Sequence, residues 1–414
     1  MKRVLIICDI FPPSFGPRMG YLCKYLRGTG WEPVVLTEKM ADQTFMLLED
    51  VCTVHAIQYY PEGKGIRSHI LRTILLILSV AGLKTYIFKR RAQQLFAFQQ
   101  FNIILCSAYR SFPLGVAAST AKRLGLPWIA DLRDIVEQYS GLEFVATKLP
   151  GFIIKNFGRI IRRRFIVSRN RALSSAACAT TVSDFHVKAL TPYCSAVRLI
   201  YNGYDPELFR PRYIPTNKFI VVYTGRLISP AMRDPSLLFQ SIRRLSAEGL
   251  FTPETFQVQW YTDPASQREI EAEATAAEVS PYMDYRSYVP ASQIPDILAA
   301  SSIVLLLANK SCDGGPRGVV TTKIFEAMGC ERPILCVRSD EDVIASLLSS
   351  TGCGQAASTL HETCQFVERL YNEWLECGYT SVKVNRTVIE SFSRSGQAKQ
   401  FIDVFEEFSA GGNY

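Results

Sequence analysis

Residues 303–329 have the sequence IVLLLANKSCDGGPRGVVTTKIFEAMG, in which an apolar strand at 303–308 leads through a glycine-rich loop into a predicted helix. Backbone N–H groups of the loop and the positive end of the helix dipole meet there, and both attract an anion. Lys323 adds a positive charge, and Glu326 shares its helix face one turn later. A cation for a diphosphate and a carboxylate for sugar hydroxyls together suit a nucleotide clamp. The alternative is an ordinary helix start with a surface Lys–Glu pair.

The same alternation of strands and helices recurs along the chain. Residues 4–8 and 34–36 are predicted strands on either side of a helix at about 19–27, which makes a right-handed βαβ unit. The other predicted strands lie at 102–106, 128–132, 219–224, 256–262, 284–288, 303–308 and 334–337. This order predicts an α/β fold of doubly wound parallel sheets, whose ligands bind beyond the carboxyl ends of the strands.

The length of 414 residues exceeds one ordinary hydrophobic core and predicts two domains. We expect a Rossmann-like N-terminal domain at 1–200 and a Rossmann-like C-terminal domain at 218–391, facing each other across a cleft. Residues 201–217 are rich in proline and glycine and are expected to link them. A helix at 392–409 is expected to pack back on the N-terminal domain.

The composition fits a soluble globular protein, since 48% of residues are hydrophobic and 20% are charged. Twelve cysteines occur without CxxC pairs and four histidines lie far apart, so neither a zinc site nor a disulfide framework is predicted. The first residues lead directly into a strand that is too short for a signal peptide. We therefore expect a cytoplasmic protein in a reducing compartment.

A loop at 11–18 follows the first predicted strand and has the sequence FPPSFGPR. Gly16 would let the backbone approach a phosphate or a sugar. No GxGxxG pattern is present, so a nicotinamide dinucleotide site is not expected. The alternative is a rigid turn without a ligand.

A second loop begins at the end of the strand 128–132 and holds Asp131, Arg133 and Asp134. Two carboxylates on either side of a guanidinium can orient an acceptor hydroxyl or act on its proton, and we predict these three residues to be catalytic. The alternative is an internal Asp–Arg ion pair that holds the loop.

A third loop follows the strand 219–224 and carries Gly225, Arg226 and Arg233. Arginine forks bind phosphate oxygens in pairs, so this loop suits a diphosphate, although a solvated basic loop is the alternative. Together with Lys323, the two arginines predict a dianionic ligand that is held without an obligatory metal ion. No DxD motif occurs in a suitable place, which agrees with this prediction.

Taken in order, these segments resemble the GT-B glycosyltransferases of family 4, which use nucleotide-sugar donors. The resemblance is carried by residues 11–18, 30–37, 128–134, 202–209, 225–226 and 323–328. It implies that Glu326 binds the ribose hydroxyls of the donor, that Arg226 binds its diphosphate and that Gly16 lies near its phosphates. It also implies a retaining reaction, no cofactor, and a structural role for the turn at 202–209.

The sequence departs from the family pattern at two positions. The E-x7-E pair of the family would place its first glutamate at position 318, where this chain has Gly318. The basic residue expected five positions after Arg226 would fall on Ala231, so that Arg233 would have to substitute for it. The resemblance to a subgroup of similar sequences implies that Lys323 compensates for these changes.

The function we predict is transfer of a sugar from a nucleotide sugar to a saccharide or lipid-linked acceptor in surface-polysaccharide assembly. One alternative is a sugar-nucleotide 2-epimerase of the same fold, which would need acid and base groups that the scarce histidines do not supply. Another is a non-catalytic binding or scaffold protein, which the missing glutamate at Gly318 keeps open.

Two stretches of the N-terminal half, 66–91 and 152–171, are basic and contain no acidic residue. The apolar part of the first, 73–83, is too short to span a bilayer and resembles an interfacial helix. We predict contact with an anionic membrane surface, which would make the protein peripheral on the inner face of the cytoplasmic membrane. The alternative is two buried helices with solvated basic rims. Nucleic acid is not expected, because few aromatic side chains accompany the basic residues.

Overall fold

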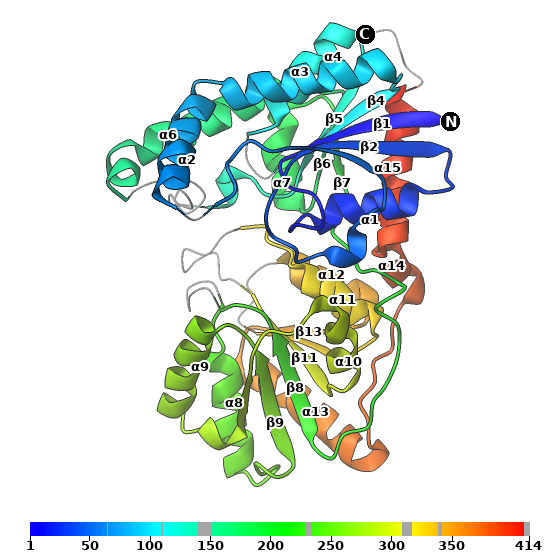
Figure 1. The fold of residues 1–414 in the computed structure, drawn as a ribbon. Coiled ribbons are helices and arrows are strands. Elements are labelled where there is room, and N and C mark those ends of the chain that lie inside the picture. The colour runs from blue at the N-terminus through cyan, green and yellow to red at the C-terminus, as the bar shows by residue number, and fades with distance from the viewer. Residues whose placement is uncertain are drawn as a thin grey trace. The chain divides into compact units, whose positions relative to one another are not determined.

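The computed structural model describes residues 1–414 except 64, 109–110, 140–150, 228–232, 309–316, 338–341 and 410–414. Its contacts divide the chain into two compact units, one formed by Met1–Tyr201 with Gln397–Tyr414 and the other by Asn202–Gly396. Each unit contains one parallel sheet with helices packed on it (Figure 1). The predicted fold class, two doubly wound parallel sheets, is confirmed.

The sheet of the first unit has seven strands in the order β3-β2-β1-β4-β5-β6-β7. The strands are β1 (Lys2–Cys8), β2 (Trp31–Glu38), β3 (Thr53–Ile57), β4 (Ile103–Ala108), β5 (Trp128–Leu132), β6 (Cys178–Thr181) and β7 (Val197–Leu199). The helices are α1 (Pro17–Leu26), α2 (Ile66–Val80), α3 (Leu83–Phe98), α4 (Leu114–Leu124), α6 (Gly151–Leu173) and α7 (Asp184–Leu190). The chain returns to this unit in α15 (Arg394–Ser409).

The strand β1 lies inside this sheet and pairs with β2 on one side and β4 on the other. Its residues from Val4 to Cys8 are all fully buried, as the continuous apolar run predicted, because helices cover both faces of the sheet. α15 belongs to one of these covering layers. Its buried side chains in the core of the first unit are Ala398, Phe401, Val404, Phe405 and Phe408.

The sheet of the second unit has six strands in the order β10-β9-β8-β11-β12-β13. The strands are β8 (Phe219–Thr224), β9 (Phe256–Tyr261), β10 (Met283–Arg286), β11 (Ile303–Leu307), β12 (Ile334–Val337) and β13 (Gly354–Ala357). The helices are α8 (Ser236–Ala247), α9 (Pro264–Ala276), α10 (Ile294–Ala299), α11 (Thr322–Gly329), α12 (Asp342–Thr351), α13 (Leu360–Cys377) and α14 (Arg386–Ser391). Strand order reverses beside β8, which pairs with both β9 and β11.

The turn at 202–209 is held by close packing inside the second unit. A Cβ on Gly203 would overlap the carbonyl oxygen of Phe392, and a Cβ on Gly329 would overlap the ring of Tyr204. The buried carboxylate of Asp205 accepts a hydrogen bond of 3.0 Å from the backbone N–H of Glu207. Most of the segment that we expected to be a linker, 201–217, therefore belongs to the second unit.

Candidate functional site

The predicted donor residues of the second unit lie where two neighbouring strands end. Gly225 directly follows β8, and the loop after β11 leads to α11, whose first turn carries Lys323. Glu326 is one turn further along this helix. Parallel strands bring their carboxyl ends to one edge of a sheet, so residues about a hundred positions apart meet here. The first part of the glycine-rich loop, 309–316, lies outside the described residues.

Lys323 lies against the backbone of Gly225. A Cβ at position 225 would overlap the Nζ atom of Lys323, and the φ of Gly225 is +143°, a conformation that favours glycine. The Nζ atom also lies 5.3 Å from the centre of the Tyr223 ring, within the range of a cation–π contact. The glycine therefore makes room for the ammonium group of Lys323.

The charges of this cluster perturb each other. Burial, together with the positive charge of Arg233, lowers the pKa of Lys323 to about 7, while Glu326 opposes the shift. Burial raises the pKa of Glu326, and the positive charges of Lys323 and Arg394 oppose that shift. An anion bound beside Lys323 would favour its charged form and so restore the ordinary pKa.

The loop after Gly225 is fixed through its backbone. The hydroxyl of Tyr223 donates a hydrogen bond of 2.8 Å to the carbonyl oxygen of Arg226, and Arg233 donates to the same oxygen. The side chain of Arg226 is 68% exposed, and its Nε donates a hydrogen bond of 3.1 Å to the hydroxyl of Tyr288. The side chain of Arg233 thus lies near Tyr223 and Lys323, whereas the side chain of Arg226 is exposed to solvent.

The start of α11 adds backbone donors to these cations. Thr321 is its N-cap residue and makes no side-chain capping bond, so the first N–H groups are open to a ligand. A cationic cluster beside an uncapped helix start suits a phosphate group. A nearby carboxylate at Glu326 can accept hydrogen bonds from hydroxyl groups. The cluster can therefore hold a phosphorylated ligand that also carries hydroxyls.

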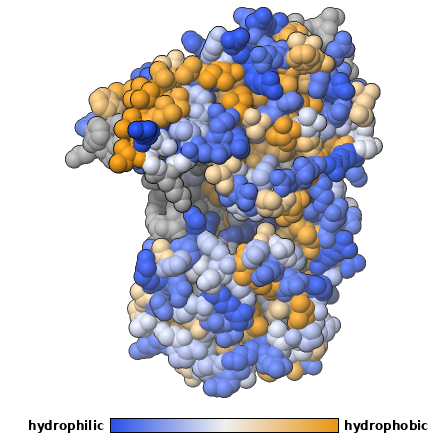
Figure 2. Space-filling model, viewed as in Figure 1, coloured by the Kyte–Doolittle hydropathy of each residue, from blue (hydrophilic) through white to orange (hydrophobic). Residues whose placement is uncertain are grey.

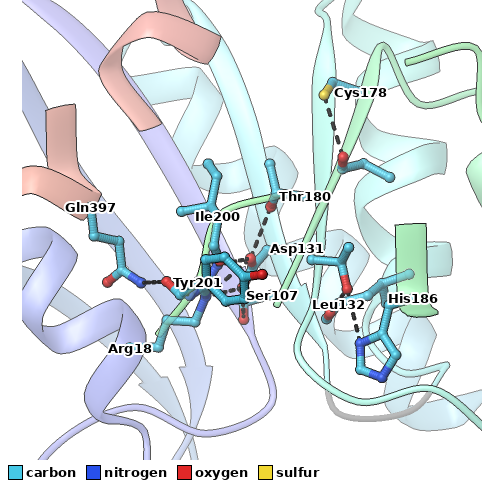
Figure 3. Close-up of polar contacts among 12 residues, drawn as sticks. Arg18, Ser107, Asp131, Leu132, Cys178, Thr180, His186, Ile200, Tyr201 and Gln397 are labelled. Atoms are coloured by element: carbon cyan, nitrogen blue, oxygen red, sulfur yellow. Dashed lines mark hydrogen bonds and ion pairs between the residues drawn. The ribbon is translucent and has the colours of Figure 1, made fainter. Parts of the chain in front are cut away.

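In the first unit, Asp131 lies at the centre of a buried polar cluster (Figure 3). The strand register places Ser107 of β4 and Thr180 of β6 directly beside it, and their hydroxyls donate to its carboxylate at 2.9 and 2.8 Å. The guanidinium of Arg18, on α1, donates from Nη2 at 2.9 Å and from Nε at 3.1 Å. Arg18 also donates to the carbonyl oxygens of Ile200 and Tyr201.

This geometry favours the structural alternative for Asp131. Its side chain is 0% exposed and that of Arg18 is 2% exposed, so the carboxylate already has its partners. The arginine that pairs with Asp131 is Arg18 of α1, and not an arginine of the same loop as that alternative had it. Arg133 instead faces Asp9, with its Nη2 atom 3.4 Å from the carboxylate of Asp9.

Asp134 is the member of the predicted catalytic trio whose carboxyl group lies beyond the end of β5 and is only half-buried. Burial and the negative charge of Asp9 raise its pKa, while a hydrogen bond from Gln138 and the charge of Arg133 oppose the shift. The Nε2 atom of Gln138 donates to Oδ1 of Asp134 at 3.1 Å. One oxygen of the carboxyl group is thereby oriented.

Gln138 is itself held by a buried histidine. Its Oε1 atom accepts a hydrogen bond of 3.1 Å from the backbone N–H of Ile135 and lies 3.0 Å from Nε2 of His186. Burial lowers the pKa of His186 to about 4, so the ring is neutral near pH 7. Because Oε1 can only accept, the neutral ring carries its proton on Nε2, and Nδ1 faces the hydroxyl of Thr181 at 3.1 Å. His186 and Gln138 thus fix the carboxyl group of Asp134.

Gly16 is the N-cap residue of α1 and lies close to the preceding loop. A Cβ at this position would lie 2.7 Å from the carbonyl oxygen of Ile10, closer than real Cβ contacts allow. The glycine is therefore required by its own loop, and no side chain caps the helix start that follows it.

Sequence reasoning missed Arg18, Tyr223, Gln138 and His186. Arg18 was placed in a loop and not matched to a carboxylate 113 positions away. Tyr223 stands in the predicted apolar strand 219–224 and was not singled out. His186 was considered only as a metal ligand or as an acid or base group. Among the described residues, no group of three or more His, Cys, Asp and Glu side chains could hold a metal ion.

Comparisons with known proteins concern the fold of the chain. Residues 15–203 match the family model of the glycosyl transferase 4-like domain. A sequence search of curated proteins found no match. Among solved structures, HepE from Anabaena in complex with UDP-glucose is 15% identical with a TM-score of 0.64, and the match covers 98% of this chain and 100% of HepE.

Two further solved structures are similar over almost the whole chain. Sucrose-phosphate synthase from Thermosynechococcus elongatus is 14% identical with a TM-score of 0.65, covering 99% of this chain and 100% of the synthase. The lipopolysaccharide outer core galactosyltransferase WaaB is 12% identical with a TM-score of 0.58, covering 98% of this chain and 99% of WaaB. Residues 15–203 therefore match the glycosyl transferase 4-like domain, and the chain as a whole has the GT-B fold.

Proposed function

We propose that this protein transfers a sugar from a UDP-sugar to a saccharide or lipid-linked acceptor in the assembly of a cell-surface polysaccharide. The observation that carries the proposal is the cluster of Lys323, Arg233 and Glu326 beside Gly225, in a chain of GT-B fold. HepE, which shares this fold, has been solved with UDP, with UDP and glucose, and with UDP-glucose.

In the proposed reaction, the acceptor oxygen bonds to the anomeric carbon as the bond from that carbon to the β-phosphate oxygen breaks. UDP leaves with the electron pair of the broken bond. Lys323 and Arg233 stabilise the negative charge that develops on the diphosphate, and Arg226 would add to this charge by exchanging its contacts with Tyr288 and Asp263 for the diphosphate. These cations are proposed to make a metal ion unnecessary, which predicts full activity in the presence of EDTA.

We propose a retaining reaction, in which the proton of the acceptor hydroxyl passes to the departing phosphate oxygen. Asp134 would then accept a hydrogen bond from a neighbouring hydroxyl of the acceptor and so hold the attacking hydroxyl on the face of the sugar from which the phosphate departs. Gly318 supplies no carboxylate at the position where the family carries one. The anomeric configuration of the product, determined by NMR, tests the retaining assignment.

The cellular setting is also a proposal. We propose that the protein is cytoplasmic, that it needs no cofactor besides its nucleotide-sugar substrate, and that it is peripheral on the inner face of the membrane. The basic stretches 66–91 and 152–171 would contact anionic lipid there. A lipid-linked acceptor would be met at the same surface.

Incubation with a panel of nucleotide sugars tests the transferase proposal against its alternatives. Slow release of UDP from one UDP-sugar, accelerated by a suitable acceptor, supports a transferase. An isomerised sugar nucleotide would instead support an epimerase, and binding without turnover would support a scaffold protein. The chain has only four histidines that could serve as acid and base groups at C2, and we therefore do not favour the epimerase.

The ribose contact proposed for Glu326 can be tested by one substitution. Glu326→Ala is expected to weaken UDP binding about 10- to 100-fold, because hydrogen bonds from hydroxyls to a half-buried carboxylate are lost. Calorimetry with UDP and with its 2′,3′-dideoxy analogue separates the ribose contact from effects on Lys323. The wild type should discriminate between the two ligands, and the variant should not. Equal discrimination by both proteins would refute the ribose contact, and Glu376→Ala, at an exposed position of α13, is the control.

The lowered pKa of Lys323 predicts that donor affinity depends on pH. Below pH 7 the side chain of Lys323 is charged in the free protein. Above pH 7 it is neutral and must gain a proton when the diphosphate binds. The affinity for UDP-glucose, whose diphosphate does not titrate in this range, should fall by up to about tenfold per pH unit as the pH rises above 7. Lys323→Arg should abolish the dependence, since arginine stays charged. Parallel profiles for both proteins would show that Lys323 does not contact the diphosphate.

A further inference from the structure

Most large apolar side chains of the helix α2 face away from the first unit, whereas a helix of a globular protein normally turns them inward. Its half-buried face, turned toward the first unit, consists of Ser68, Arg72, Leu75, Leu76 and Ser79. The large apolar residues of its outer face are each between 39% and 80% exposed. They are Ile66, Ile70, Leu71, Ile74, Ile77 and Leu78. Figure 2 shows hydrophobic residues gathered over the region where Figure 1 places α2 and the adjoining α3. A helix that packs only against protein normally buries its apolar stripe.

Polar contacts fix the helix in this orientation. The guanidinium of Arg72 donates to the carbonyl oxygen of Pro61 from Nε at 3.3 Å and from Nη2 at 3.0 Å. The hydroxyl of Tyr59 donates to the carbonyl oxygen of Leu75 at 2.9 Å. Rolling α2 to bury its isoleucines would break these bonds and would turn Arg72 away from its acceptor. The apolar face is therefore held outward.

The length and composition of α2 exclude a simple membrane span. Among the described residues, no single helix is long and apolar enough to cross a bilayer, although Ile66–Ser79 with Leu83–Phe98, bent by 77°, passes the same test as a pair. α3 is unsuited to that role, because Phe88, Ala92 and Leu95 bury it in the core of the first unit. The exposed face of α2 is thus suited to lying along an interface instead of crossing it.

The charges around α2 indicate what that interface is. Lys84 is not part of the surface, since its Nζ atom lies 2.5 Å from the carboxylate of Glu38 in a largely buried ion pair. Arg67, Arg90 and Arg91 are exposed, and no acidic residue occurs between 66 and 91. A second copy of the chain docked on this face would bring two sets of like charges together. An anionic lipid surface offers the opposite charge.

The second basic helix, α6, divides its arginines in a similar way. Arg169 forms a bidentate ion pair with Glu137, with both distances 2.6 Å, and Arg162 donates to the carbonyl oxygen of Tyr139. The exposed positions of α6 include both arginine and apolar residues, among them Phe157, Arg159, Ile160, Arg163, Arg164 and Val167. Its free arginines therefore suit surface contact, whereas its outer face is less apolar than that of α2.

We propose that α2 lies in the plane of an anionic bilayer, with Ile66, Ile70, Ile74 and Ile77 inserted among the lipid chains and Arg67 at the phosphates. This inference rests on the membrane contact in the proposed function and names the helix and the face that make it. α2 carries the hydrophobic part of the binding, and the exposed arginines of α3 and α6 add only attraction to anionic headgroups. Binding should consequently retain a part that salt does not remove.

Flotation with vesicles tests this assignment without donor or acceptor, so its result does not depend on the transferase activity. The variant Ile70→Ser/Ile74→Ser/Ile77→Ser is expected to bind vesicles of phosphatidylglycerol and phosphatidylcholine at least about tenfold more weakly than wild type. Met46→Ser/Leu47→Ser/Leu375→Ser replaces three exposed apolar residues elsewhere and is the matched control. Arg163→Gln/Arg164→Gln should reduce binding at low salt only. Equal binding by the isoleucine variant and wild type would overturn the proposal.

A second measurement reports the depth of insertion directly. Ile74→Trp should show a blue-shifted emission on addition of these vesicles and should be quenched by lipids brominated near the headgroup end of their chains. Phe98→Trp, at an exposed position on the C-terminal end of α3, is the comparison and should be quenched less. Unquenched emission from position 74 in the vesicle-bound protein would contradict insertion. Light scattering tests the other occupant of this face. If the wild type is a dimer and the isoleucine variant is a monomer, the face binds a second copy of the chain and the proposal is wrong.

Discussion

Asp131→Ala is expected to destabilise the first unit by about 3–5 kcal/mol, the range for breaking a buried ion pair from one side. The substitution leaves the guanidinium of Arg18, only 2% exposed, without its counter-charge. It also removes the acceptor of the Ser107 and Thr180 hydroxyls. The carbonyl oxygens of Ile200 and Tyr201 remain as partners of Arg18 but carry no charge that compensates it.

Urea unfolding followed by probes in each unit measures this loss. Because a chain of two units can unfold in more than one transition, the transition of the first unit should move while that of the second stays in place. The neighbouring substitution Arg133→Ala removes a half-buried side chain 3.4 Å from its carboxylate partner and is the control. A first-unit transition that moves no further in Asp131→Ala than in this control would show that the cluster does not stabilise the fold.

Asp134→Asn is expected to lower turnover about 100-fold with little change in stability. Asp131→Ala, in contrast, is expected to act mainly on stability. Asp134→Asn keeps the shape of the side chain and an oxygen for the hydrogen bond from Gln138. It removes the negative charge that would orient the acceptor hydroxyl, and errors of orientation of about 1 Å cost rates of this size. We expect the loss in kcat with an unchanged affinity for the donor, because Asp134 belongs to the first unit and the donor cluster to the second.

Steady-state kinetics with the acceptor varied, together with thermal unfolding, separates this role from a structural one. Gln138→Ala should reproduce part of the loss in kcat, since it releases the carboxyl group that Gln138 and His186 orient. Gln138→Glu is not a suitable rescue, because it would place two carboxyl groups together. An Asp134→Asn protein with wild-type turnover would remove Asp134 from the reaction.

The strands that the sequence predicted include those with continuous aliphatic runs. β1, β8 and β11 are buried on both faces and contain four or more apolar residues in succession. The strands that it missed are β3, β6, β7 and β13, and β6 with the sequence CATT shows the reason. Such a strand is defined by pairing with its neighbours, in this case β5 and β7, and not by its own hydrophobicity.

The two halves of the candidate site differed in how far the sequence could predict them. The donor residues follow the ends of predicted strands in the sequence, so Gly225, Lys323 and Glu326 could be selected from local motifs. The role of Asp131 depends on the register of three strands and on an arginine 113 residues away, neither of which has a local signal. Sequence reasoning therefore predicted a catalytic role for Asp131, and the ion pair that it gave as the alternative did not include Arg18.

The central claim is that the cluster around Lys323 and Glu326 holds a UDP-sugar for transfer, and release of UDP from UDP-glucose and related donors tests it most directly. We predict slow release of UDP by the wild-type protein from at least one UDP-sugar, with no isomerised donor. The release should be strongly reduced in Glu326→Ala under the same donor concentration. If no UDP-sugar binds or is cleaved, or if cleavage proceeds equally well in Glu326→Ala, the account of this site is wrong.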